Sequence, residues 1–164
     1  MNAADGSALR QEINQLVSRR NSNPHGPVNP EHASTISRIR RRLRGLPHSA
    51  LVQTLQELLD ELDVAALAAD NSSSYVAANA KATELTGYPH AELLRMTVND
   101  LAPPPKSQFH DAWNHFIQSG HLSSDLVLRR KNGEPVGIHH AAYASIAPGV
   151  HLSLLTPLEI PSSI

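Results

Sequence analysis

The sequence predicts an α+β fold: an antiparallel five-stranded sheet with helices on one face, preceded by an α-helical N-terminal segment. Two strand-like stretches lie between residues 64 and 78, helix-like spacing follows as far as residue 119, and three strand-like stretches follow from residue 124. Asn132-Gly133 and Pro148-Gly149 are turn signals that join the last three strands as hairpins. Two strands, then helices, then three strands favour a single antiparallel sheet on which the helices pack.

The composition fits a globular protein with a real core. The chain has 164 residues, of which 40% are hydrophobic and 18% charged, enough for one domain and an appendage. It contains no cysteine, which excludes disulfides, cysteine-ligated metals and a thiol nucleophile. No apolar run approaches the roughly 20 residues of a membrane span, and the N-terminus does not resemble a signal peptide. We therefore expect a cytoplasmic protein without a membrane partner.

Residues 1–48 form a basic segment of helices and linker. The segment has eight arginines and three acidic residues, whereas the rest of the chain has six basic and twelve acidic residues. A short helix is predicted over 8–18 and a linker over 20–30, where three prolines interrupt polar residues. A second helix is predicted from Pro30, capped by Asn29, to Arg44. This charge asymmetry indicates two functional segments or an acidic partner.

Residues 49–62 are predicted to form an amphipathic linker helix that begins with Ser49 as its cap and ends at Leu62. Its apolar stripe includes four leucines with helical spacing: Leu51, Leu55, Leu58 and Leu62. The stripe is a candidate dimerisation surface, and the alternative is that it covers the sheet.

Residues 63–158 are predicted to form the sheet domain, and residues 159–164 a C-terminal tail. The predicted strands are Val64–Asp70, Ser73–Ala78, Ser124–Arg130, Val136–Ile146 and Val150–Thr156. The predicted helical segments are Ala80–Thr86, Pro89–Met96, Thr97–Leu101 and Lys106–Ser119. Asn79 is placed to cap the first of these helices, and Gly87 to end it.

Several motifs of this domain follow one another in a characteristic order. They are the Asp70-Asn71 turn, the Ala-Asn-Ala strand end at 78–80, ELTGY at 84–88, AELL at 91–94, LRRKNGEPV at 128–136 and IAPGVHLSL at 146–154. Together they resemble the PAS domain of bacterial signalling proteins. The resemblance implies a sensory or protein-interaction module that relays a ligand or partner signal through its flanking helices, either as a homodimer or with a signalling partner protein.

The sequence offers no enzyme signature, since it lacks a nucleophile elbow, a phosphate-binding glycine loop and a carboxylate pair with a credible base. We therefore predict that the chain is not an enzyme. Within the PAS resemblance, the absence of cysteine excludes flavin-cysteinyl adduct photochemistry, and the cofactor remains unknown. A small-molecule ligand in the cleft between sheet and helices is compatible with the family.

Haem is one alternative. The Phe109-His110-Asp111-Ala112-Trp113 segment is similar to the helix that supplies the iron ligand in oxygen-sensing haem-PAS kinases. At 100° per residue, His110 lies at the edge of the helix's apolar stripe and can turn inward, whereas His115 lies roughly opposite. His110 is thus the candidate metal ligand of a gas or redox sensor, and the alternative is a boundary histidine without a ligand.

Four further residues are candidates for the cleft. In the strand Val136–Ile146, every second residue forms a largely apolar face: Val136, Ile138, His140, Ala142, Ala144 and Ile146. The side chain of His140 is therefore expected to face the core or cleft, whereas His139 faces the other way. Trp113, Tyr75 and Asn79 are expected near the cleft. For each, a structural role is the alternative: a satisfied core histidine, plain aromatic core and a helix cap.

The arginine run of residues 38–44 includes Arg40, Arg41 and Arg42. It is a candidate contact with nucleic acid, which would make the protein a PAS-containing transcription regulator. The alternatives are a solvated helix face, an acidic protein partner or a clamp on the acidic end of helix Ser49–Leu62. The long loop at 20–30 is unlike the short turn of a helix-turn-helix motif, which argues against DNA binding.

Overall fold

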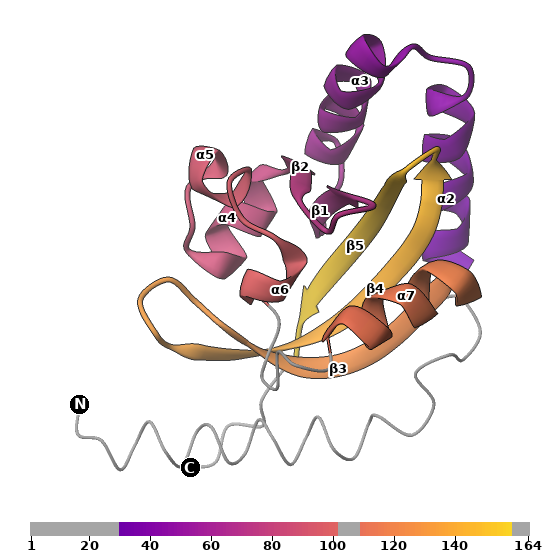
Figure 1. Cartoon of the computed structure of the whole chain (residues 1–164). Helices are drawn as coiled ribbons and strands as arrows, with labels where there is room; N and C mark the ends of the chain where they lie inside the picture. The colour runs from indigo at the N-terminus through magenta and orange to yellow at the C-terminus, as the bar shows by residue number, and fades with distance from the viewer. Residues whose placement is uncertain (1–29, 102–108, 159–164) are drawn as a thin grey trace, which may run out of the picture.

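The computed structural model describes residues 30–101 and 109–158 and contains an antiparallel sheet with the strand order β2-β1-β5-β4-β3. The predicted helix at 8–18, most of the linker at 20–30, the start of helix Lys106–Ser119 and the tail at 159–164 lie outside the described residues. The strands are β1 (Ala65–Asp70), β2 (Tyr75–Ala78), β3 (His121–Arg129), β4 (Pro135–Ala147) and β5 (Val150–Pro157). The predicted α+β class and five-stranded sheet are confirmed (Figure 1).

Helices pack on both faces of this sheet. The helices are α2 (Pro30–Leu43), α3 (His48–Asp60), α4 (Ala80–Thr86), α5 (His90–Leu93), α6 (Val98–Leu101) and α7 (Phe109–Ser119). The helices α4 and α7 contact one face, through β1 and through β3 and β4 respectively, and α5 and α6 lie beside them (Figure 1). The N-terminal helices α2 and α3 pack against the opposite face and against each other. The N-terminal helices therefore complete the core of the domain.

The layer under α2 and α3 depends on small residues of the sheet. Ile39 and Leu55 are fully buried in one apolar cluster, and the sheet contributes alanines to that cluster at positions such as Ala66, Ala68 and Ala77. Alanine side chains let a helix approach the strands closely, so leucine and isoleucine from the helices fill the space above them. Aliphatic residues thus supply most of this core, as the low aromatic content of 4% requires.

The helical hairpin differs from the sequence prediction at its N-terminal cap. Pro47 occupies the N-cap position of α3 without a side-chain cap, and Ser49 lies inside the helix, so the predicted Ser49 cap is wrong. The two helices run antiparallel through a tight connection (Figure 1). The basic C-terminal end of α2 therefore lies beside the start of α3, away from its acidic end at Asp60 and Glu61. The antiparallel geometry does not favour the predicted clamp.

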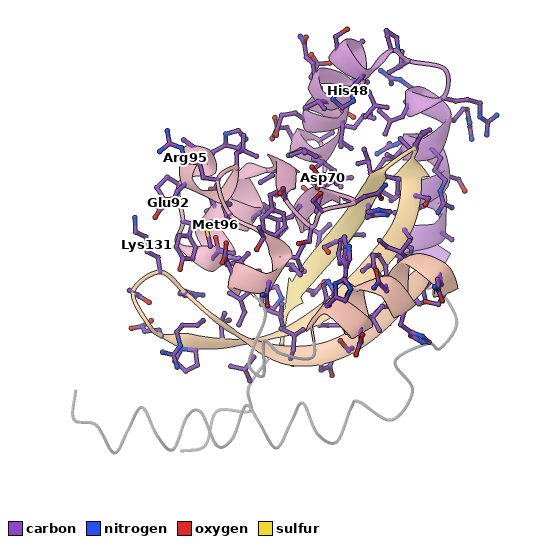
Figure 2. All side chains as sticks on the ribbon, viewed as in Figure 1. His48, Asp70, Glu92, Arg95, Met96 and Lys131 are labelled. Carbon is purple, nitrogen blue, oxygen red and sulfur yellow. The ribbon has the colours of Figure 1, made fainter. Side chains whose placement is uncertain are left out.

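The β3–β4 hairpin turns at Asn132-Gly133 as predicted, with Gly133 at φ +91°. Strand β3 begins at His121, three residues before the predicted start, because His121 pairs with Tyr143 on β4. The hairpin is tied to the helices by the backbone of Lys131, which donates to the Thr86 carbonyl at 3.0 Å. Figure 2 shows Lys131 beside Glu92, which it contacts at 2.6 Å. This ion pair is exposed and contributes little to stability.

Strand β4 changes face at Ser145. This residue has φ +56°, an uncommon conformation for a residue with a side chain, and lies in an irregularity of the β4–β5 pairing. The expectation that Ile146 shares the face of His140 is therefore wrong, because the bulge places Ile146 in the cluster under α2 and α3. Ala142 and Ala144 remain on the α7 side.

Among the described residues, no helix combines the length and apolar character that crossing a membrane requires.

Candidate functional site

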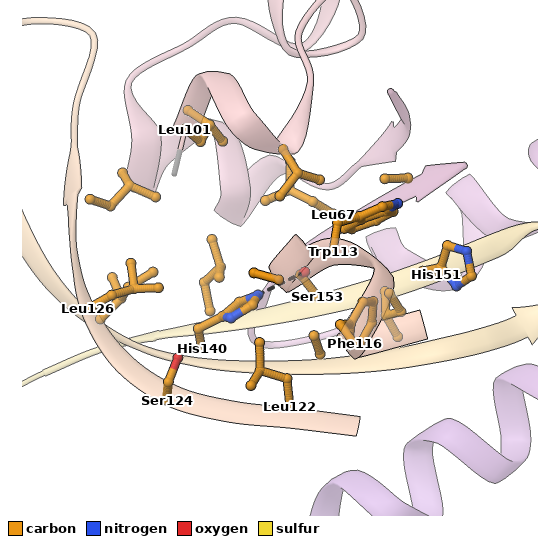
Figure 3. Close-up of a pocket in the computed structure, with 18 of the residues that line it drawn as sticks. Leu67, Leu101, Trp113, Phe116, Leu122, Ser124, Leu126, His140, His151 and Ser153 are labelled. Atoms are coloured by element: carbon orange, nitrogen blue, oxygen red, sulfur yellow. Dashed lines mark hydrogen bonds between the residues drawn. The ribbon is translucent and has the colours of Figure 1, made fainter. Parts of the chain in front are cut away.

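A cavity of about 330 Å³ lies between the sheet and helices α6 and α7. Its floor consists of side chains from all five strands, and Leu101 of α6 with Trp113 and Phe116 of α7 form part of the wall opposite (Figure 3). The alternation of side chains along a strand determines which residues form the floor, since every second residue of β3 and β4 faces the cavity. Where residues 30–101 and 109–158 form the wall, it contains no aspartate, glutamate, lysine or arginine.

Three polar residues from adjacent strands interrupt the apolar floor. Ser124 on β3 pairs with His140 on β4, and Ser153 lies next to them on β5. His140 Nε2 lies 3.0 Å from Ser153 Oγ, a hydrogen bond drawn in Figure 3. Throughout this article we call Ser124, His140 and Ser153 the polar row.

The imidazole of His140 is neutral at pH 7. Burial lowers its pKa from 6.5 to about 4, and repulsion by the neighbouring His139 adds to the effect. The ring keeps partial exposure because it faces the cavity, although protein surrounds it. Its Nδ1 atom is buried and has no hydrogen-bond partner in the described part of the chain. The prediction that His140 points toward the core or cleft is confirmed.

A second polar group lies at another part of the wall, around His151. The Ser145 backbone N–H donates to His151 Nδ1 at 2.9 Å, so the ring proton is on Nε2, which donates to Asn71 Oδ1 at 2.7 Å. Trp113 Nε1 donates to the Asn71 carbonyl at 3.0 Å. Burial lowers the pKa of His151, while Asp70 acts in the opposite direction. We call His151, Asn71, Trp113 and Ser145 the His151 network. It joins the cavity wall to the β4 bulge.

The two predicted aromatic residues both line the cavity. Trp113 packs against Phe116 with ring centroids 5.5 Å apart and is only partly buried. Tyr75 is 7% exposed, and burial together with the nearby Asp100 carboxylate raises the pKa of its hydroxyl. Both are thus cavity residues and core residues at the same time.

Asn79 lies outside the cavity wall and connects three elements. Its Oδ1 accepts from the backbone N–H groups of Ala82 and Ala66, both at 3.0 Å, and its Nδ2 donates to the carbonyls of Leu59 at 2.9 Å and Val64 at 2.8 Å. The Ala82 bond is the predicted helix cap. Asn79 therefore ties α4 to β1 and to the end of α3, and the geometry gives it no direct contact with a cavity ligand.

His110 does not reach the cavity. Its side chain is exposed on α7 and its Nε2 lies 3.2 Å from Asn114 Nδ2, one turn further along the same helix. The expectation that His110 can turn inward as a metal ligand is wrong, because its edge of the helix faces solvent. The uncharged wall also gives haem propionates no cationic partner among the described residues. The residues present do not fit haem held by His110.

The predicted interaction residues fall into two groups. Leu51, Leu55 and Leu58 are 5%, 0% and 2% exposed in the cluster beneath α3, and Leu62 is partly buried against it. The leucine stripe therefore covers the chain's own sheet, which is the second role considered for it. The arginines Arg40, Arg41 and Arg42 are exposed on α2, and Arg40 also donates to the Ala144 carbonyl at 3.2 Å.

Sequence reasoning missed Ser124, Ser153 and His151. The alternation of β5 places His151, Ser153 and Leu155 on one face, a signal present in the sequence but not followed. It also missed a row on the opposite face of β3 and β4. There His139 Nε2 lies 3.1 Å from Ser123 Oγ and His139 Nδ1 lies 2.6 Å from Asp125 Oδ1. The chain of contacts from Ser123 through His139 to Asp125 resembles a catalytic triad. The three residues lie side by side on one sheet face, however, and there His139 pairs with the buried Asp125.

Comparisons with known proteins agree with this architecture. A family model described as the PAS fold matches residues 59–144. The LOV protein of Rhodobacter sphaeroides has 21% identity and a TM-score of 0.57, covering 68% of this chain and 69% of that chain. A domain of the sensory box sensor histidine kinase/response regulator from Geobacter sulfurreducens has 18% identity and a TM-score of 0.55, covering 68% and 99%.

A third structure is the PAS domain, in complex with ethanol, of a LuxR-family transcriptional regulator from Burkholderia thailandensis. It has 14% identity and a TM-score of 0.51, covering 69% of this chain and 98% of that chain. No curated protein matches the chain. The structural likenesses support the fold, and the family model spans more than half of the sequence. The chain therefore belongs to the PAS family, whose domains are typical sensory modules of signal transduction.

Proposed function

We propose that the chain is a non-catalytic sensory module that binds a small molecule in the cavity and relays its presence through α2 and α3 to a partner. The observation that carries this proposal is the cavity of about 330 Å³, which is mainly apolar and has a few convergent polar groups. Cavities of a few hundred Å³ with such linings are the usual form of small-molecule sites. A ligand buried there gains from the removal of apolar surface from water.

The His151 network supports a route from the cavity to α2. A ligand that contacts Trp113 or His151 also acts on Asn71 and on the Ser145 N–H, because hydrogen bonds join these groups. The residue before Ser145 in β4 is Ala144, whose carbonyl accepts from Arg40 of α2. The bulge at Ser145 thus lies between a cavity residue on one face and a helix on the other.

A second connection supports a role for α3. Gln56 of α3 exchanges two hydrogen bonds with the backbone of Ala78, at 2.7 Å and 3.1 Å, and Asn79 holds the Leu59 carbonyl. Tyr75, at the other end of β2, lines the cavity. A shift of β2 on ligand binding therefore alters the contacts of α3. A ligand produces such a shift only to the extent that it binds one arrangement more tightly than the other.

The output surface in this proposal is the exposed side of α2. Its arginines at 38, 41 and 42 are exposed, as is Arg44 directly after the helix, which suits an acidic protein partner or a second copy's acidic surface. Dimerisation through Leu55 would require α3 to leave the sheet, so we place the partner contact on α2. Binding of duplex DNA by the same arginines stays an alternative, and salt-dependent binding to duplex would support it.

The test uses the chain's single tryptophan, which lies in the cavity wall. A library of small molecules is screened for shifts in thermal unfolding, and each hit is titrated by Trp113 fluorescence. The control variant is Ala142→Phe, which places a large side chain in the floor, where Ala142 is 3% exposed. The proposal expects hits that saturate in the wild type and fail in the folded variant. Hits that bind both proteins equally, or a library without any hit, would contradict it.

A further inference from the structure

The cavity combines an uncharged wall with a narrow polar row, and this combination limits what it can bind. Leu122, Leu126 and Ile138 surround the polar row on the floor, and the described wall opposite is aromatic and aliphatic. Burial of a charged group without a partner is strongly unfavourable, so an ionised ligand group would have nothing to pair with there. The wall therefore favours an uncharged ligand.

The polar row has hydrogen-bonding capacity that the protein does not use. Ser124 faces the cavity, and its hydroxyl makes no hydrogen bond within residues 30–101 and 109–158. Ser153 Oγ already forms a hydrogen bond with His140 Nε2. A serine hydroxyl can both donate and accept, so one ligand group at this point finds a partner whichever role it takes.

The imidazole extends this versatility. If Nε2 carries the proton it donates to Ser153, and if Nδ1 carries it Ser153 donates to Nε2. The Ser153 hydroxyl is therefore free to donate its proton to a ligand in the first case and to accept a hydrogen bond with its lone pairs in the second. The two states adapt the row to a donating or an accepting ligand group.

The cavity volume sets the size of the ligand. A cavity of about 150 Å³ holds benzene, so a cavity of about 330 Å³ holds roughly twice as many non-hydrogen atoms, or about ten to fifteen. Figure 3 shows Trp113 on the side of the cavity opposite the polar row, so the apolar part of a ligand bonded to the row lies toward α7.

We propose that the cavity binds an uncharged, mainly apolar molecule whose single hydroxyl, carbonyl or amide group bonds to the polar row, with Ser124 as its first partner. This inference rests on the proposed function, because it names the ligand class of the same cavity. Ser124 and Ser153 thereby become specificity residues, while the apolar wall supplies most of the affinity.

The experiment compares three matched sets of probes. The first contains 2-phenylethanol, 3-phenyl-1-propanol and 4-phenyl-1-butanol, the second the alkylbenzenes in which a methyl group replaces the hydroxyl, and the third the corresponding carboxylates. Each probe is titrated at neutral pH by Trp113 fluorescence and by calorimetry. At least one alcohol is expected to bind, and each carboxylate to bind more weakly than its alcohol.

The variants then separate a hydrogen bond from general packing. Ser124→Ala is expected to weaken alcohol binding about fivefold and to leave alkylbenzene binding unchanged, because one hydrogen bond is lost. Ser124→Thr keeps the hydroxyl and should retain the preference. Ser123→Ala is the matched control, since its side chain lies on the opposite face beside His139. It should leave both probe sets unchanged.

Several outcomes would overturn the inference. These are tighter binding of a carboxylate than of its alcohol, equal loss of alcohol and alkylbenzene binding in a folded Ser124→Ala protein, no change in either, or no alcohol binding at all. In the last case a hit from the wider library that depends on the cavity would leave the proposed function standing. Only the absence of any cavity-dependent hit would remove both.

Discussion

Substitution of Asn79 distinguishes most clearly between a local role, as the cap of α4, and a wider role, in joining α4 to β1 and α3. A residue that only caps α4 can be replaced by aspartate at little cost, because asparagine and aspartate are comparable caps. The structure gives Asn79 two further bonds through Nδ2, to the carbonyls of Leu59 and Val64 at 2.9 Å and 2.8 Å. Asn79→Asp keeps both acceptor bonds of Oδ1 and replaces this donor by an oxygen facing two carbonyl oxygens.

The magnitude follows from the burial of the site. Asn79 is 2% exposed, and the loss of a partner leaves a buried polar group at a cost of about 1–3 kcal/mol. With two carbonyls affected, Asn79→Asp should lower the free energy of unfolding by about 3 kcal/mol or more, and Asn79→Ala by at least as much. Thr83→Ala is the control within α4, because its hydroxyl bonds only to the exposed end of its own helix.

The assay is urea unfolding at neutral pH, followed by circular dichroism. The free energy of unfolding is compared among the wild type, Asn79→Asp, Asn79→Ala and Thr83→Ala. We expect a large loss of the free energy of unfolding for both Asn79 variants and a small one for Thr83→Ala. An Asn79→Asp protein within about 1 kcal/mol of the wild type would contradict a joining role of the side chain, since Asn79 would then act only as a cap.

Two further predictions concern stability. The pKa of His140 is about 4 in the folded state against 6.5 in the unfolded state, so the unfolded state binds a proton at a higher pH than the folded state. The contribution of neutral His140 to the free energy of unfolding is therefore fully present above pH 6.5. It falls by about 3 kcal/mol as the pH is lowered toward 4. The lowered pKa of His151 acts in the same direction, and a His140→Phe variant should flatten the profile in urea unfolding between pH 4 and 7; an unchanged slope would count against the assignment. Leu55→Ala should lower the free energy of unfolding by about 2–5 kcal/mol without altering the mass in solution, because Leu55 is fully buried under α3. Loss of a dimer in light scattering at unchanged stability would instead restore the leucine stripe as an interface.

Much of the fold follows from local signals in the sequence. The Asn-Gly turn fixes the β3–β4 hairpin because Gly133 takes up the left-handed backbone of the turn, at φ +91°, which glycine adopts without steric cost. The position of Asn79 directly before a predicted helix indicated a helix cap, and the alternation of β4 predicted that His140 lies on the cavity side. These predictions succeed because turn chemistry and strand periodicity act over a few residues.

The remaining features depend on tertiary contacts. The bulge at Ser145 moves Ile146 from the cavity face of the sheet to the face under α2 and α3, and the local alternation of residues does not predict this change. Helix geometry left His110 on a boundary, and only the packing of α7 decides that it faces solvent. The leucines of α3 fit either a dimer or the sheet equally well from their spacing. Their partners are the sheet residues of the same chain, which lie far away in sequence.

In the proposed function, occupation of the cavity changes α2 on the opposite face of the sheet. The most direct test is amide hydrogen exchange of the wild type and the Ala142→Phe variant, with and without a saturating cavity ligand such as 2-phenylethanol, if the titration shows that it binds. We expect a ligand-dependent change in exchange within residues 36–43 of α2 in the wild type and none in the variant. A saturating Trp113 response with unchanged exchange in α2 would contradict it.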